Sequence, residues 1–275
     1  MLSVPFNVYS MNAEFSAALG WLLEPFRRPR LEANSIPVWV YVPEAWRDRP
    51  KAPYLYVRGD EIPHRSLFPA SILTYAAWDI PTQAHRNAPD FLLVHSGSVR
   101  FDGGSMLLPG STGAGKSTLT AMLLERGSSY LSDELGAIDP VTSRIYPFPK
   151  RISLKFGSLK FFPGLEERLE DRAILPPSQE ERFVPPEIFG AKVAEPAPLR
   201  WVVFPGPERE GAPRLSPIAK AEATELLARN ALNLYRFQDR GLILLSRVMR
   251  EAEGYRLDGG DAKARADLLA ERFLN

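Results

Sequence analysis

The stretch Gly110-Ser-Thr-Gly-Ala-Gly-Lys-Ser-Thr118 matches the complete phosphate-loop pattern G-x-x-x-x-G-K-S/T. Its glycines carry no Cβ, so consecutive backbone N–H groups can turn towards one anion. The apolar run Leu119-Thr-Ala-Met-Leu-Leu124 predicts a helix directly after the loop, and Gly127 is placed to end it. The positive N-terminal end of that helix would add to the attraction for phosphate. A glycine-rich turn without a ligand is the simpler alternative.

The loop predicts a site for nucleotide phosphates and a magnesium ion. Lys116 would reach the β- and γ-phosphates, and the hydroxyl of Ser117 would bind Mg²⁺. The predicted binding residues are Gly110, Ser111, Thr112, Gly113, Ala114, Gly115, Lys116, Ser117 and Thr118.

The segment before the loop predicts a β-hairpin. Ser98–Phe101 and Ser105–Leu108 have strand character, and Asp102-Gly-Gly104 between them is a tight-turn sequence. A further strand is predicted at Phe91–His95. In most P-loop folds the strand that leads into the loop belongs to a parallel βαβ unit. Here that strand is expected to be the second arm of an antiparallel hairpin.

Two adjacent carboxylates follow the loop at an informative distance. Ser129–Ser132 predicts a short strand, and Asp133 and Glu134 stand at its end, 17 positions after Lys116. One helix, one turn and one strand fit this gap, so the pair is expected to return beside the loop. One carboxylate could then bind Mg²⁺, and the other could accept a proton from an attacking hydroxyl, which phosphoryl transfer requires. A solvated strand end is the alternative for this pair.

Further polar residues are candidates with weaker support. His95 ends an apolar strand and could contact a phosphate or influence the carboxylates through its charge, or it could be purely structural. Lys150, Arg151 and Lys155 alternate with apolar residues, and any of them could supply a cation in the transition state. The alternative for these three is a solvated strand face.

Composition excludes several classes of function. The chain has 275 residues and a formal net charge of +1, so its bulk charge does not indicate a nucleic-acid partner. It contains no cysteine, which rules out disulfides, thiol nucleophiles and Cys-ligated zinc. No apolar run is long enough for a membrane span, and the first residues do not resemble a signal peptide, so a cytoplasmic protein without membrane contact is expected.

Two domains are predicted, at residues 1–88 and 89–275. The first is a smaller α+β region for recognition or assembly, with strands at Val38–Val42 and Tyr54–Val57 and a helix within Leu67–Asp79. The second contains the phosphate loop. Its other predicted elements are a hairpin of Ala137–Asp139 and Arg144–Tyr146, strands at Arg151–Lys155 and Trp201–Phe204, and helices at Ile218–Leu232, Leu242–Ala252 and Ala262–Phe273.

Over roughly residues 88–273 the chain resembles the HPr kinase/phosphorylase-related kinases. The matching segments are Val94–Gly97, Leu107–Thr118, Tyr130–Glu134, Pro147–Lys155, Trp201–Pro205 and the stretch from Asn230 to Asn233. The resemblance implies an α/β (α+β) fold with a mixed-sheet P-loop core like that of phosphoenolpyruvate carboxykinase. It also implies an ATP- and Mg²⁺-dependent kinase that acts on a hydroxyl, commonly of a serine. By position Asp133 resembles the family's general base, Glu134 its neighbouring carboxylate and His95 the histidine before the hairpin.

Three departures from the family pattern indicate an acceptor other than HPr. Thr118 stands where HPr kinases have Glu, Glu134 stands where they have Asp, and their later Arg-Gly-Leu-Gly type signature is absent. The acceptor is therefore expected to be a peptide, protein or small-molecule hydroxyl, such as the serine of a lasso-peptide precursor. Relatives form hexamers, so a homo-oligomer is possible. A regulatory or assembly ATPase and a carboxykinase-like enzyme are the alternative functions.

Overall fold

The phosphate-loop sequence joins strand β6 (Gly104–Pro109) to helix α3 (Lys116–Glu125). The computed structural model describes residues 5–27, 34–41, 54–86, 91–111, 113–170, 181–207 and 209–274. The chain divides into two units. The larger contains residues 89–163 and 182–275, and the smaller contains residues 2–88 and 164–181.

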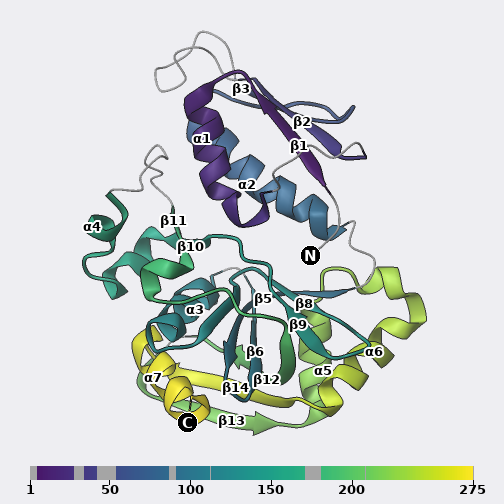
Figure 1. The fold of residues 1–275 in the computed structure, drawn as a ribbon. Coiled ribbons are helices and arrows are strands. Elements are labelled where there is room, and N and C mark those ends of the chain that lie inside the picture. The colour runs from purple at the N-terminus through teal and green to yellow at the C-terminus, as the bar shows by residue number, and fades with distance from the viewer. Residues whose placement is uncertain are drawn as a thin grey trace. The chain divides into compact units, whose positions relative to one another are not determined.

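A mixed β-sheet forms the centre of the larger unit (Figure 1). Its strands, besides β6, are β5 (Leu92–Phe101), β7 (Ser129–Ser132), β8 (Leu135–Ile138), β9 (Arg144–Tyr146), β12 (Ala197–Pro205), β13 (Arg209–Ile218) and β14 (Glu253–Gly260). The strand order is β13-β14-β12-β6-β5-β8-β9, and β7 pairs with β5. Strands β6, β12 and β14 run parallel, whereas β5 is antiparallel to β6. The predicted hairpin before the phosphate loop is therefore confirmed.

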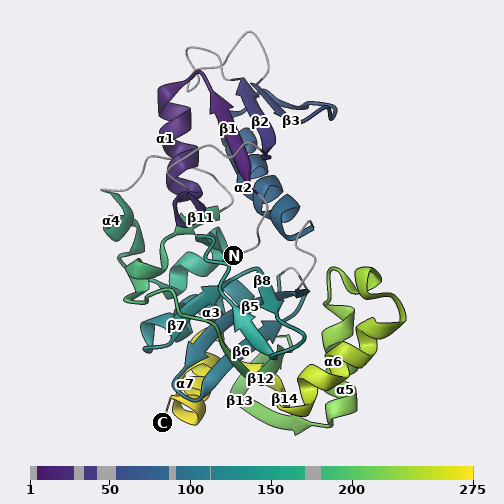
Figure 2. The same ribbon diagram turned by 45° about the vertical axis from the view of Figure 1, so that its right-hand side comes forward.

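Helices cover both faces of this sheet. Helices α5 (Lys220–Arg229) and α6 (Gly241–Arg250) lie on one face, and α3 and α7 (Ala262–Phe273) lie on the other, as Figures 1 and 2 show. Leu227 and Leu245 pack with Leu107 and Val202 in the core of the first layer. On the opposite face Phe273 contacts Trp201, with their ring centroids 4.9 Å apart.

The remaining elements of the larger unit are short. They are β10 (Ile152–Lys155) and β11 (Glu181–Val184), which form a two-stranded sheet, and the 3₁₀ segments Phe156–Phe161, Pro186–Phe189 and Leu234–Arg240.

Helix α3 ends as its sequence predicts. Gly127 has a positive φ of 102°. Its N–H donates to Leu124 O, and Ser128 N–H donates to Leu123 O. This pair of bonds is the Schellman arrangement, in which a glycine at the first position beyond the cap satisfies the last carbonyls of a helix.

The two strands predicted at Phe91–His95 and Ser98–Phe101 are one continuous strand, β5. The separation into two strands was wrong because Gly97 lies within β5 and serves a different purpose. A Cβ at Gly97 would overlap Thr120 Oγ1, so the glycine lets α3 approach the sheet. Thr120 is completely buried at this contact.

We expect Gly97→Ala to lower the free energy of unfolding by about 1–3 kcal/mol, because the added methyl group forces α3 away from β5. Chemical denaturation would measure this change. Gly157→Ala is the matched control, since among the described residues, apart from Gly157 and its two chain neighbours, no atom lies within 4 Å of the place that its added methyl group would take. Equal stability of the two variants would contradict the close-approach explanation.

The smaller unit contains a four-stranded sheet of order β1-β2-β3-β4. Its described elements are β1 (Phe6–Ser10), α1 (Ala13–Leu22), a 3₁₀ turn at Glu24–Phe26, β2 (Ile36–Tyr41), β3 (Tyr54–Arg58), β4 (His64–Ser66), α2 (Pro69–Arg86) and α4 (Leu165–Glu170). The predicted strands at Val38–Val42 and Tyr54–Val57 correspond to β2 and β3, with Val42 outside the described residues. The helix predicted within Leu67–Asp79 begins at Pro69 and continues to Arg86, with Pro81 inside it.

The predicted mixed α/β fold class is confirmed by the large sheet and its helical layers. None of the described helices has the length and apolar character that crossing a membrane requires.

Candidate active site

The phosphate loop has the backbone conformation that its glycines permit. Gly113 and Gly115 have positive φ values of 89° and 77°, and Gly115 is the N-cap of α3. Leu119 N–H makes a helical bond to Gly115 O. The N–H groups of Lys116, Ser117 and Thr118 lie in the first turn, where a helix offers no acceptors of its own. The loop therefore places these first-turn N–H groups at the N-terminus of α3. The predicted site residue Thr112 lies outside the described residues.

Lys116 folds back over this loop. Its Nζ donates to Gly110 O at 2.7 Å and to Ser111 O at 2.9 Å. The side chain is buried, and this burial lowers the pKa of its ammonium, whereas the charges of Asp133 and Glu134 raise it. Because both acceptors are loop carbonyls, a bound anion could replace them as the partner of the ammonium.

Asp133 lies at the end of β7, as predicted, and is 3% exposed. Its Oδ2 accepts a hydrogen bond from Ser153 N–H at 3.0 Å. Its Oδ1 is buried and has no hydrogen-bond partner among the described residues. A buried carboxylate oxygen without a partner is costly to a fold, so it calls for an explanation.

Burial raises the pKa of Asp133 to about 6. The positive charge of Lys150 lowers this pKa and the charge of Glu134 raises it, whereas the bond from Ser153 N–H and the side chain of Ser117 lower it. A carboxylic acid with a pKa near neutrality is well matched to proton transfer at physiological pH.

Glu134 points towards a different partner. Its Oε2 forms an ion pair with Lys150 Nζ, and the two side chains are 35% and 12% exposed, respectively. The backbone N–H groups of Glu134 and Leu135 both donate to Ser132 Oγ, which fixes the turn that separates the two carboxylates.

His95 on β5 lies opposite Leu135 on β8, beside the carboxylate turn. Burial lowers the pKa of its imidazole, the charges of Lys116 and Lys150 lower it further, and Glu134 opposes them. The neutral imidazole is therefore favoured. The structure thus brings His95, Lys116, Asp133 and Glu134 together, as the sequence predicted.

The three predicted cations differ in position. The charge of Lys150 lowers the pKa of Asp133 and of His95. Lys155 is exposed, and its charge lowers the pKa of Lys116. Arg151 is buried. The hydroxyl of Thr118 donates to Ser158 Oγ at 2.7 Å.

Oxygen ligands for Mg²⁺ are present but sparse. The described residues contain no group of three or more His, Cys, Asp or Glu side chains arranged to hold a metal ion. Mg²⁺ bound with a nucleotide needs only one or two protein oxygens, because phosphates and waters complete its shell. Ser117 and Glu134 therefore fit such an ion as its predicted protein ligands.

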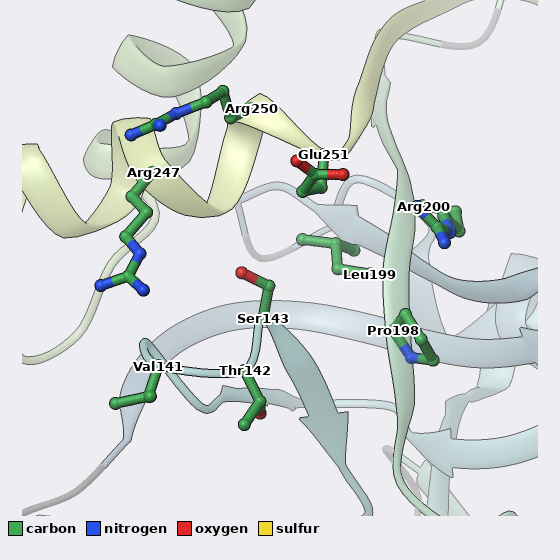
Figure 3. A pocket seen from close by; sticks show the side chains of 9 residues that line it. All are labelled: Val141, Thr142, Ser143, Pro198, Leu199, Arg200, Arg247, Arg250 and Glu251. Carbon is green, nitrogen blue, oxygen red and sulfur yellow. The ribbon is translucent and has the colours of Figure 1, made fainter.

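A cavity of about 410 Å³ lies elsewhere in the larger unit (Figure 3). In Figure 3 the β8–β9 turn lines one side and the end of α6 the opposite side. Its lining residues are Val141, Thr142, Ser143, Pro198, Leu199, Arg200, Arg247, Arg250 and Glu251. Leu199 pairs with Ser105 at the start of β6, whereas the phosphate loop follows the end of β6. This cavity is therefore separate from the predicted phosphate site.

No protein-family model matches the chain, and a search of curated proteins found no match. The resemblance to the HPr-kinase-related kinases stays a prediction.

Proposed function

We propose that this protein is a phosphotransferase that moves the γ-phosphate of MgATP to a hydroxyl group, with a serine of a peptide or protein as the favoured acceptor. The observation that carries this proposal is the Asp133 carboxylate. It is buried, and its Oδ1 has no hydrogen-bond partner among the described residues. The side chain of Ser117, at the start of α3, lowers the pKa of this carboxylate. A proton-accepting oxygen beside a phosphate loop is the arrangement that a hydroxyl kinase requires.

The loop residues fit a nucleotide triphosphate. The N–H groups in the first turn of α3 would hold phosphate oxygens, and Lys116 would exchange its bonds to Gly110 O and Ser111 O for the β- and γ-phosphates. Ser117 and Glu134 would hold Mg²⁺, and Glu134 would do so while its Oε2 stays paired with Lys150. When bound, this ion neutralises charge on the phosphates and helps to align them.

Asp133 would act on the acceptor. As the acceptor oxygen forms its bond to the γ-phosphorus, Oδ1 takes the hydroxyl proton and the bond between the γ-phosphorus and the bridging oxygen breaks, which releases ADP. Lys116 would stabilise the charge on the transferring group. The neutral form of His95 adds no further positive charge to hold Asp133 in its ionised form.

The acceptor class rests on the family resemblance and on its departures at Thr118 and Glu134. A serine in a precursor peptide is the proposed acceptor, and a small-molecule hydroxyl is the variant to be tested beside it.

The test is phosphate transfer from γ-labelled ATP with Mg²⁺ to a panel of serine-containing peptides and small alcohols. Mass spectrometry should find one phosphate ester on an acceptor and an equal amount of ADP. Release of inorganic phosphate without any phosphorylated acceptor across the panel would favour a regulatory or assembly ATPase instead.

A further inference from the structure

Lys150 is brought to the candidate site by backbone contacts rather than by a regular strand. It follows β9 in a segment whose Phe148 N–H donates to Leu131 O at 2.9 Å. The hydroxyl of Tyr130, a completely buried residue on β7, donates to the carbonyl of Lys150 itself. These two bonds fix the segment along β7, the strand that ends at the two carboxylates.

The ammonium of Lys150 then pairs with Glu134. Only 12% of the Lys150 side chain is exposed, so this ion pair is better shielded from water and salt than a surface pair. The neighbouring Asp133 keeps an oxygen without a partner among the described residues, although it is the more deeply buried of the two acids. Lys150 therefore pairs with the carboxylate of Glu134, and Oδ1 of the neighbouring Asp133 stays available.

We propose that Lys150 is a positioning residue that assigns separate roles to the two carboxylates: it holds Glu134 in an ion pair and so leaves Asp133 Oδ1 as the oxygen available to the acceptor hydroxyl. This inference rests on the proposed function. It differs from a direct role in the transition state, because Lys150 acts through Glu134 and does not touch the phosphates.

The physical reason is that two adjacent acids compete. Without a partner, the Glu134 carboxylate would repel an ionised Asp133 and could turn towards the same acceptor proton. An ion pair of restricted geometry removes that competition, because it neutralises Glu134 and limits the directions in which its longer side chain can point.

A double-mutant cycle tests this assignment. Lys150→Met should lower kcat by about 100-fold, the scale expected when a reacting group is misplaced by about 1 Å. In a Glu134→Gln background the same change should lower kcat by less than about threefold, because the group through which Lys150 acts is already neutral. Lys150→Arg should restore most of the activity, since a guanidinium can also pair with Glu134. Equal losses in both backgrounds, or no restoration by arginine, would overturn the proposal.

Nucleotide binding gives a second measurement that does not depend on turnover. Calorimetry with Mg²⁺ and a non-hydrolysable ATP analogue should show less than about a threefold change in affinity for Lys150→Met, because no phosphate contact is lost. A loss of tenfold or more, of the kind expected for a phosphate-binding lysine, would overturn the positioning role. Lys160→Met is the matched control, since Lys160 is exposed and its ammonium lies over Phe161.

The two proposals fail in different ways. If the native chain transfers no phosphate to any acceptor, the proposed function is wrong. If the native chain is active but the two substitutions act additively, only the role of Lys150 is wrong. Denaturant unfolding of the native chain, Lys150→Met, Glu134→Gln and the double variant shows whether the ion pair stabilises the free protein. Additive changes in the free energy of unfolding would also overturn the positioning role.

Discussion

Lys116→Ala is expected to lower kcat by about 100- to 1,000-fold and to weaken the binding of MgATP by about 10- to 100-fold. The side chain is the only cation supplied by the loop sequence itself, and its Nζ already lies 2.7 Å from Gly110 O, within the loop that would hold the phosphates. Its removal would leave the developing charge on the transferring group without its charge-assisted hydrogen bonds.

Steady-state kinetics and calorimetry would measure these two losses. Lys116→Met is the companion variant, because it keeps most of the buried volume and removes only the charge. Both variants should keep the circular dichroism spectrum of the native chain. Native-like turnover in either variant would show that the phosphates bind elsewhere.

Local sequence signals predicted the centre of the fold well. The order of hairpin, loop, helix and short strand depends on neighbouring residues, and each element has its own start and stop signal, such as the Asp102-Gly-Gly104 turn and Gly127. These signals predict the order of the elements, whereas β5 and β7 also depend on distant contacts, such as the bonds from His95 N–H to Asn230 O and from Tyr130 N–H to Lys192 O.

Strand β13 was missed because its sequence argues against a strand. Arg209–Ile218 contains Gly211, Pro213 and Pro217 and has no apolar alternation. It lies at the edge of the sheet and pairs with β14 alone among the described strands, with a register shift between Arg209 and Arg214. Prolines are tolerated at such an edge because one side of the strand needs no ladder partner. Edge position is a property of the whole sheet, so local sequence did not reveal it.

The sequence also did not show which of Lys150, Arg151 and Lys155 pairs with Glu134. All three fit one alternating pattern, but the segment containing Lys150 is not a regular strand. Its position depends on the hydroxyl of Tyr130, 20 residues earlier in the chain. A pattern of apolar and polar residues carries no information about such a bond, so the partner of Glu134 had to be observed.

Asp133→Asn is expected to remove phosphate transfer and, at the same time, to stabilise the free protein. Replacement of a general base by a neutral amide should lower kcat by about 1,000-fold. The amide oxygen can still accept the bond from Ser153 N–H, so the local structure should persist. A gain in stability is expected because the native residue must be ionised while buried.

The sign of this gain follows from the pKa of Asp133. Its value of about 6 in the folded chain exceeds the ordinary value of 3.8, so the folded state holds the proton more tightly than the unfolded state. Native stability therefore falls as the pH rises from about 4 to about 6, and the full cost, about 3 kcal/mol, applies above that range. Asp133→Asn should unfold at higher denaturant concentration than the native chain near pH 8, and this advantage should disappear near pH 4.

Asp79→Asn is the matched control for this prediction. Asp79 is also buried, at 2% exposed, but Tyr56, Arg58 and Gln83 all donate to its carboxylate. Removal of its charge should destabilise the smaller unit by about 2–3 kcal/mol, because the Arg58 guanidinium loses its buried counter-ion and keeps the exposed Glu61. Probes in each unit should be followed separately, since two units need not unfold in one transition. If Asp133→Asn behaves like Asp79→Asn and loses stability near pH 8, Asp133 is a structural acid and its assignment as the base is wrong.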